Sequence, residues 1–556
     1  MIDDYRKKSF YQIWVRSFSD GNGDGIGDLY GVYEKIDYIE SLGVDGIWFS
    51  PLYPSPNADY GYDVADYKNI DPAYGDLKIF QKLLDELHRR NMYVIMDLVV
   101  NHTSDEHQWF KESKKSRNNK YSDYYIWRDP KYKNGRRIPP NNWYSLLEGN
   151  AWEYSPERDQ YYLHLFAKKQ PDLNMDNPLV REEVKSIMRF WLDMGVDGFR
   201  EDVITFISKH PKLPDGLPFI PASNGMPYYK DGPRLEEYLH EFRQVCKEYN
   251  AIQIGETPMT NVKTALKYIS GEERSLDMVF NFDHMMADCF MTEYIPHRFN
   301  LIKLKSAFSR WQYGLDGKGW NALYLENHDH PRVISRYGNT KLHYESGTAL
   351  AVSYLFQQGT PFIYQGQEIG MTNIFLASIE EYVDVSSKNN FYSFHINEPL
   401  AKRLRRIHFS SRDSSRTPMQ WNSEKYAGFS RTKPWFKINK NYKRINVERE
   451  DKDPHSILNF YRKCLALRRE YEGLIYGSYT EHYHFHPFIY CYERIWESER
   501  FLIVISFSSK QQNFKFPSSF EKGYDRLLLC NYDIREGKTP ETSLKPYEAR
   551  LYYLKK

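Results

Sequence analysis

Four times within the first 256 residues, a stretch with helical periodicity is followed by a short apolar stretch that ends in polar residues. Such a repeat constrains the fold, because strands that alternate with helices pair in parallel and bury both faces of their sheet. Polar residues at the carboxyl ends of parallel strands indicate a site at one face of a barrel. The pattern by itself leaves an open, doubly wound sheet as the alternative. Helices are predicted at 33–43, 77–87, 184–191 and 235–246, and strands at 44–49, 93–100, 196–202 and 252–256.

The alternation is interrupted once and ends before the C-terminus. Between 102 and 170 the chain is rich in Tyr, Trp, Asn and Pro, as in the run 139–143, which predicts an inserted lobe. From about residue 477 short alternating stretches follow one another and predict an antiparallel β domain. The expected organisation is a barrel in two parts, 1–101 and 171–476, with the lobe at 102–170 and the β domain at 477–556.

Composition and charge exclude several classes of protein. The chain is 41% hydrophobic and 27% charged, which is ordinary for a globular protein, and its net charge of +2 offers no footprint for nucleic acid. The basic run at 402–406 is short enough to be a solvated helix face. The N-terminus has no signal sequence, the chain has no long apolar run, and its five cysteines are scattered. These features favour a cytoplasmic protein without a membrane anchor. We expect a monomer or weak oligomer.

Three carboxylates follow predicted strands or stand in a polar cluster farther along the chain. They are Asp202, Glu256 and Asp329. Hydrolysis of a glycosidic bond with retention needs one carboxylate as nucleophile and a second, protonated one as acid, about 5 Å apart. Arg200 lies two residues before Asp202, so on a strand both side chains point to the same side and the cation favours the ionised nucleophile.

These carboxylates stand in recognisable motifs. The segments 97–102 (DLVVNH), 198–202 (GFRED), 255–256 (GE) and 327–329 (NHD) resemble, in order, the four signature motifs of the α-amylase family of glycoside hydrolases. The segment 170–174 (QPDLN) is similar to that of the oligo-1,6-glucosidase subgroup. The resemblance covers essentially the whole chain. It implies a (β/α)8 TIM barrel, a lobe inserted after the third strand and a C-terminal antiparallel β-sandwich domain.

The resemblance also implies roles for individual residues. Asp202 would be the nucleophile, Glu256 the acid/base and Asp329 the stabiliser of the transition state. Asp59 and Arg412 match a pair at the closed end of a pocket, which implies exo action. The expected substrate-binding residues are Asp59, Tyr62, His102, Phe166, Arg200, Val203, His328 and Arg412.

A glycine-rich loop near the N-terminus places oxygen-bearing residues at alternate positions. Asp20, Asn22, Asp24, Ile26 and Asp28 are its candidate ligands, and hard oxygen donors suit Ca²⁺. The loop lacks the closing glutamate of an EF-hand, since residue 31 is Gly. It resembles the loop of the subgroup that holds a structural Ca²⁺. No organic cofactor is expected.

The expected activity is that of a retaining, exo-acting α-glucosidase on short oligosaccharides. Val203 follows the nucleophile, and members of the subgroup that resemble isomaltases carry Val there, so we expect a preference for α-1,6 bonds. The alternatives on the same scaffold are a sucrose or trehalose hydrolase, a trehalose-6-phosphate hydrolase and a sucrose isomerase. The segment 282–288 contains no arginine, which argues against the isomerase, and the intact carboxylates argue against a non-catalytic binding protein. Glu201, beside the nucleophile, has no functional explanation from sequence.

Overall fold

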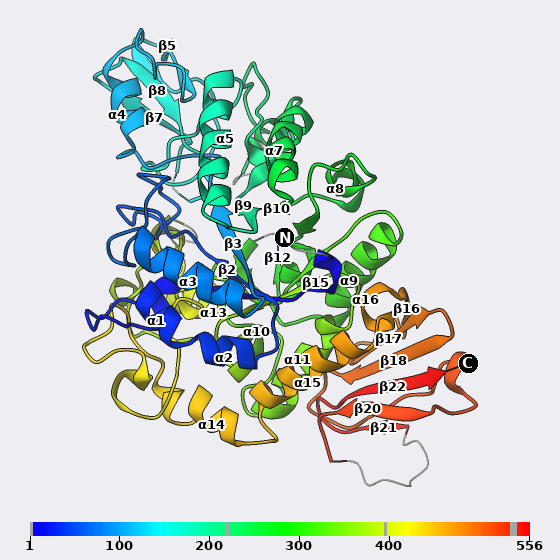
Figure 1. The fold of residues 1–556 in the computed structure, drawn as a ribbon. Helices are drawn as coiled ribbons and strands as arrows, with labels where there is room; N and C mark the ends of the chain where they lie inside the picture. Colours follow the sequence, from blue (N-terminus) through cyan, green and yellow to red (C-terminus); the bar gives the residue numbers. More distant parts are fainter. Residues whose placement is uncertain are drawn as a thin grey trace.

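The computed structural model describes residues 4–147, 149–217, 223–290, 292–393, 397–533 and 542–555. Its centre is a barrel of eight parallel strands (Figure 1). A bridge between Val279 and Asn321 joins the first and last strands of the sheet order and closes the barrel. In order of pairing, the strands are β1 (Phe10–Ile13), β2 (Gly46–Phe49), β3 (Tyr93–Leu98), β9 (Gly198–Glu201), β10 (Ile252–Glu256), β11 (Met278–Phe280), β14 (Ala322–Leu323) and β15 (Thr360–Tyr364).

Helices surround the barrel and begin at recognisable caps. Asp76 accepts hydrogen bonds from the first amides of α3, and Asn177 with Pro178 starts α5. The predicted helix at 33–43 is wrong as one element, because the backbone leaves helical geometry at Lys35 and divides it into α1 and α2. The surrounding helices are α1 (Leu29–Glu34), α2 (Ile36–Ser41), α3 (Leu77–Arg89), α5 (Pro178–Asp193), α7 (Leu235–Tyr249), α8 (Val262–Ile269), α9 (Leu301–Leu315), α11 (His343–Leu355) and α15 (Ile457–Glu470).

Because alternate residues of a strand point to opposite sides, the barrel strands contribute to two apolar layers. One layer fills the barrel interior, and the other lies between the strands and the surrounding helices. Ile252 and Ile254 of β10 point inward and join a small interior cluster with Trp48 and Phe280. Phe199 of β9 points outward and packs in the large cluster between strands and helices. By the same alternation, the last inward-facing residue of several strands lies at the carboxyl end of the barrel, above the interior apolar cluster.

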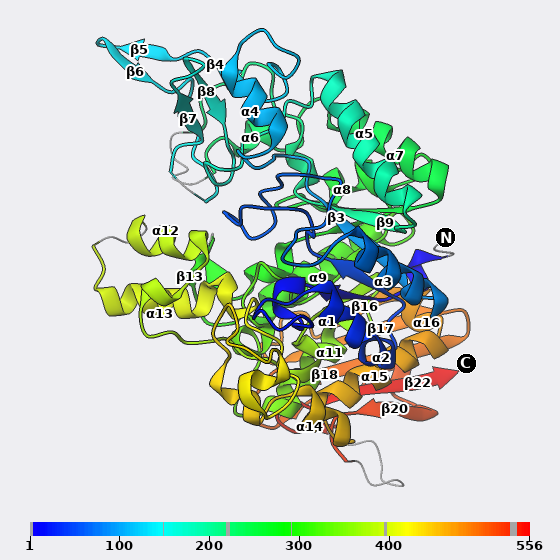
Figure 2. The ribbon, with the colours of Figure 1, turned by 60° about the vertical axis from the view of Figure 1, so that its left-hand side comes forward.

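An inserted lobe and a second excursion lie over that face of the barrel. After β3 the chain forms α4 (Gln108–Lys115), the sheet β4 (Trp127–Arg128), β8 (Gln160–Leu163) and β7 (Trp152–Ser155), and the hairpin β5 (Lys131–Lys133) and β6 (Arg136–Ile138). After β15 it forms α12 (Val385–Ser393) and α13 (Leu400–Ser410). Figure 2 shows α12 and α13 on the same side of the barrel as the lobe, with a hairpin of β12 (Cys289–Phe290) and β13 (Thr292–Pro296) beside them.

The C-terminal domain lies at the end of the molecule opposite the lobe (Figures 1 and 2). Its main sheet is antiparallel and ordered β16 (Ser478–His482), β17 (Ile489–Trp496), β18 (Glu499–Ser506), β22 (Ala549–Lys555) and β20 (Arg526–Cys530). A ribbon of β19 (Gln512–Asn513) and β21 (Ser543–Leu544) supplies the second layer through Leu544, which packs on β17 and β18. The remaining helices are α6 (Met226–Tyr229), α10 (Val333–Arg336), α14 (Val447–Lys452) and α16 (Gly473–Tyr476).

The expected fold class is confirmed, with a closed parallel barrel and a C-terminal antiparallel domain. Within the described ranges, no helix is long and apolar enough to cross a membrane.

Candidate active site

A cavity of about 220 Å³ lies at the carboxyl ends of the barrel strands, between the inserted lobe and α12. It is bounded on the lobe side by Leu147, whose carbonyl accepts a hydrogen bond of 2.7 Å from Asn389 of α12. Nine residues predicted from the sequence line it, namely Asp59, Tyr62, His102, Phe166, Asp202, Val203, Glu256, Asp329 and Arg412. Five further lining residues were not predicted as site residues, namely Leu147, Gln170, Glu293, Tyr294 and Ser386.

The floor of the cavity is organised by one buried arginine. Arg200 is 1% exposed, and its Nη1 lies 2.6 Å from Asp202 Oδ1 and 2.7 Å from Asp97 Oδ1. Its Nη2 lies 2.5 Å from Glu256 Oε1. Two carboxylates that contact the same guanidinium are held close together, which favours the spacing of retaining glycosidases over the wider spacing of inverting ones.

The charge of this cluster is unbalanced, since one guanidinium faces three carboxylates. Burial raises the pKa of Asp97 to about 6, although Arg200 opposes the rise. Burial also raises the pKa of Asp202 well above its ordinary value, with Arg200 acting against it and Glu256 and Asp97 reinforcing it. The cluster therefore retains protons at a pH where isolated carboxyls have lost them.

The turn after Asp202 is strained. Val203 has a φ of 36° and a ψ of 41°, in the left-handed region that a β-branched residue rarely occupies. This conformation directs its backbone N–H to Glu256 Oε2, at 2.8 Å. The valine side chain lines the cavity and packs against Phe206 and Tyr229. The strain thus accompanies a contact that orients the second carboxylate.

Asp329 is surrounded by positive and hydrogen-bonding groups. Arg412 Nη1 and Arg416 Nη2 each lie 3.1 Å from its Oδ1, and His328 Nε2 lies 2.9 Å from its Oδ2. Burial alone would raise the pKa of Asp329, but His328, Arg412 and Arg416 together hold it well below the ordinary range. These contacts keep Asp329 ionised at a pH where an ordinary carboxyl begins to take up protons.

Arg412 closes one end of the cavity. Its Nη2 lies 3.0 Å from Asp59 Oδ1 and 2.6 Å from Oδ1 of Asp384, a buried residue that was not predicted from the sequence. With the contact to Asp329, three carboxylates converge on this guanidinium. A network of this kind ties the loop after β2 to the loop after β15 and leaves a pocket with one blocked end.

Aromatic rings form the wall beside the carboxylates. The Tyr62 ring stacks on His328 with centroids 5.1 Å apart and planes 6° apart, and its hydroxyl donates to Asp97 Oδ2 at 3.0 Å. Phe166 lies 4.9 Å from the His102 ring, measured between centroids. Burial lowers the pKa of His102 and of His328 to about 4, so both imidazoles are neutral near pH 7.

The cavity lining carries a further carboxylate beside Tyr294 and Ser386. Glu293 of β13 lies 2.7 Å from His330 Nδ1 and 3.1 Å from Arg336 Nη1. Burial would raise the pKa of Glu293, but His330 and Arg336 lower it below its ordinary value. Next to it, the hydroxyl of Tyr294 donates to Ser386 Oγ at 2.7 Å. No motif marks these residues in the sequence, because they belong to a hairpin and a helix outside the repeated units.

Glu201 points away from the cavity, as strand alternation requires. It is fully buried, and its Oε1 accepts a hydrogen bond of 2.6 Å from Gln253 Nε2. Neither its Oε2 nor Oε1 of Gln253 has a hydrogen-bond partner. Burial raises the pKa of Glu201 to about 7, and a proton on Oε2 is the donor that these two oxygens lack.

The predicted metal loop lies away from the cavity. Asp20 accepts hydrogen bonds from Gly23 at 2.6 Å and Gly25 at 2.8 Å, and Asp28 caps α1 through Gly31. In the described part of the chain, no three His, Cys, Asp or Glu side chains gather as a metal site. The loop's donor set also includes the amide of Asn22 and a backbone carbonyl, so its oxygen chemistry fits a hard cation.

Comparison with known proteins gives matches over almost the entire chain. Residues 12–477 match the family model of the alpha-amylase catalytic domain. An oligo-1,6-glucosidase of Parageobacillus thermoglucosidasius is 45% identical, with 99% of each chain covered. A trehalose-6-phosphate hydrolase mutant of Bacillus licheniformis superposes with a TM-score of 0.94 at 42% identity, covering 99% of this chain and 100% of the other. An isomaltulose synthase mutant of Erwinia rhapontici, solved with sucrose, gives a TM-score of 0.95 at 38% identity and 99% coverage of each chain.

Proposed function

The chain belongs to the α-amylase family of glycoside hydrolases, and we propose that it is a retaining, exo-acting α-glucosidase that prefers α-1,6 bonds in short oligosaccharides. One observation carries the proposal. Asp202 and Glu256 contact the same guanidinium at the floor of a cavity whose far end is blocked.

The proposed reaction uses two displacements. Asp202 attacks the anomeric carbon as the glycosidic C–O bond breaks, and Glu256 gives its proton to the leaving oxygen. Water then gives a proton to Glu256 and attacks the same carbon, which breaks the ester to Asp202 and restores the α configuration. Asp329, ionised beside Arg412 and Arg416, stabilises the positive charge that develops on the sugar ring.

The blocked end supports exo action. The contact of Arg412 with Asp59, at 3.0 Å, stands where a longer chain would have to continue past the terminal sugar. Tyr62 and Phe166 offer ring faces beside this position, and apolar ring faces suit the faces of a pyranose. The terminal glucose of an oligosaccharide would therefore enter first.

The charge of the lining favours a neutral leaving sugar. Asp59, Asp202, Glu256, Glu293 and Asp329 line the cavity, and Arg412, already bound by carboxylates, is the one cation among its described lining residues. Each of these carboxylates already has an arginine partner, so the described lining offers a phosphate no free cation to bind. Hydrolysis of trehalose 6-phosphate, the activity named for one structural relative, is therefore disfavoured for this chain.

The linkage preference rests on Val203. Its branched side chain narrows the wall next to Asp202, and its position is fixed by the left-handed turn and by the contact of its amide with Glu256. A difference of methyl size in such a wall discriminates substrates by about 1 to 3 kcal/mol. We expect the preference for isomaltose over maltose to be incomplete.

Two parts of the proposal concern the rest of the protein. We propose that the loop from Asp20 to Asp28 holds a structural Ca²⁺ through Asp20, Asn22, Asp24, Ile26 and Asp28. The five cysteines are unpaired and four are buried, which fits a protein of the cytoplasm. We also propose that the protein is a monomer or weak oligomer.

The test compares glucose release from isomaltose, maltose, sucrose, trehalose and trehalose 6-phosphate, with the first anomer followed by NMR. We expect isomaltose to be the best substrate and α-glucose the first product. Asp202→Asn and Glu256→Gln should each lower kcat by about a thousandfold or more and remain folded, since each keeps its shape and loses its chemistry. The exposed Glu272→Gln is the matched control. Initial β-glucose, or near-parental rates in both variants, would overturn the mechanism.

A further inference from the structure

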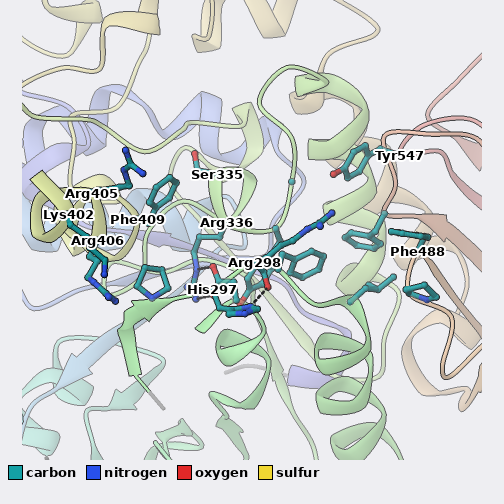
Figure 3. A pocket seen from close by; sticks show the side chains of 18 residues that line it. His297, Arg298, Ser335, Arg336, Lys402, Arg405, Arg406, Phe409, Phe488 and Tyr547 are labelled. Carbon is teal, nitrogen blue, oxygen red and sulfur yellow. Dashed lines mark hydrogen bonds and ion pairs between the residues drawn. The ribbon is translucent and has the colours of Figure 1, made fainter. Parts of the chain in front are cut away.

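A second, larger cavity lies outside the catalytic site. It has a volume of about 860 Å³ and separates α13 from the C-terminal domain (Figure 3). Its floor comes from the start of α9 and the end of α10, including Arg298 and Ser335. The two cavities share no lining residue among those described. Ligand pockets often lie at domain interfaces, and this volume falls within their usual range.

One wall is the basic run that the sequence predicts to be a solvated helix face. In α13, Lys402, Arg405, Arg406 and Phe409 line the cavity, at the spacing of one helical face. Ile407 is buried and packs in a cluster on another side of the helix. The basic residues, shown at the left of Figure 3, therefore line the open side of a cavity.

Two of the cations in this cavity have no acidic partner. Lys402 and Arg406 lie 3.1 Å and 2.9 Å from Glu398, which balances part of their charge. The guanidinium groups of Arg405 and Arg298 have no hydrogen bond or ion pair with any described residue, and both side chains are exposed. The cavity thus presents free guanidinium groups from two separate elements.

The other wall is aromatic and belongs to the C-terminal domain. Phe488 is 40% exposed, and Figure 3 shows it with Tyr547 across the cavity from the basic residues. On the α13 side, Phe409 is 43% exposed. Exposed rings on both sides of a cavity can stack on a flat sugar or base. A ligand that fits both walls carries an anion at one end and a ring at the other.

We propose that this cavity binds a phosphate monoester carried on a ring, either a sugar phosphate or a nucleotide. The basic face of α13 binds the phosphate through Arg405, because the planar guanidinium donates paired hydrogen bonds to phosphate oxygens. Phe488, on the opposite wall, contacts the ring. The charge is opposite to that of the catalytic cavity, which is lined by carboxylates, so the two sites select different ligands. The proposal is independent of the linkage or substrate of the catalytic site.

The experiment is calorimetric titration of the full chain with four probes: glucose 6-phosphate, adenosine 5′-monophosphate, inorganic phosphate and glucose. At least one ring phosphate should bind saturably and more tightly than inorganic phosphate, and raised salt should weaken it. Arg405→Gln should weaken that ligand about tenfold. The matched control is Arg449→Gln, an exposed arginine of α14 away from this cavity, which should bind like the parent.

A further variant separates the two walls. Phe488→Ala should weaken the ring phosphate severalfold and leave inorganic phosphate unchanged, since phosphate alone does not reach the ring. Binding of only the sugar phosphate or only the nucleotide identifies the source of the ligand. The proposal is overturned if neither ring phosphate binds, if glucose binds as tightly as glucose 6-phosphate, or if the Arg405→Gln variant binds like the parent.

Discussion

Replacing Glu201 by glutamine should stabilise the protein at alkaline pH. The carboxyl is fully buried in the wall between strands and helices, and burial raises its pKa to about 7, from an ordinary 4.5. Between these two values the folded chain holds a proton that the unfolded chain has lost. Stability therefore falls as pH rises through this window, and the loss is complete above the folded pKa.

The size of the loss follows from the same two values. Each pH unit between about 7 and 4.5 corresponds to about 1.4 kcal/mol, so the ionised Glu201 costs the folded state about 3 kcal/mol. Glutamine carries no charge and supplies the donor that the unpartnered Oε1 of Gln253 lacks, while it still accepts from Gln253 Nε2. The substitution Glu201→Gln removes the cost and keeps the shape.

The measurement is urea unfolding of parent and variant at about pH 5 and about pH 8.5. We expect the variant's advantage in free energy of unfolding to grow by about 2 to 3 kcal/mol between the two conditions. Glu272→Gln, at an exposed position, should show no such pH-dependent difference. An advantage that is equal at both pH values, or larger at pH 5, would refute the reasoning that burial governs Glu201.

Three other perturbations address the site and the loop. Val203→Thr keeps the branched shape and adds a hydroxyl to the wall. It should lower the ratio of kcat/KM on isomaltose to that on maltose by a factor that corresponds to about 1 to 3 kcal/mol. An unchanged ratio contradicts a role for Val203. Asp97→Asn removes a charge that raises the pKa of Asp202, so the acidic limb of the kcat/KM profile should move to lower pH, and a shift to higher pH would contradict this coupling. Chelation should lower the melting temperature clearly and change the activity of the folded enzyme little, because a metal held by residues 20–28 stabilises the native state by mass action. Elemental analysis shows whether metal was bound. Unchanged melting with no metal found would contradict the site.

The periodic elements could be predicted from local sequence, with errors at their ends. The strand at 252–256 was predicted with its observed bounds, whereas the strand predicted at 93–100 ends at Leu98. In the C-terminal domain, the alternation from about residue 477 predicts the antiparallel sheet that the structure shows, but it does not reveal every strand. Short strands such as β21 carry too few residues for a period of two to be visible, and their pairing depends on distant partners.

The sequence by itself determined a parallel sheet covered by helices and the placement of Asp202 and Glu256 at one face of it, because parallel strands bring their carboxyl ends to the same side. Only the tertiary structure decided what surrounds them. Glu293 and Asp384 come from excursions without periodicity, and their positions follow from contacts with Arg336 and Arg412, far away in the chain. Local sequence also could not show that the basic face of α13 borders a cavity, because the opposite wall is folded from residues of another domain.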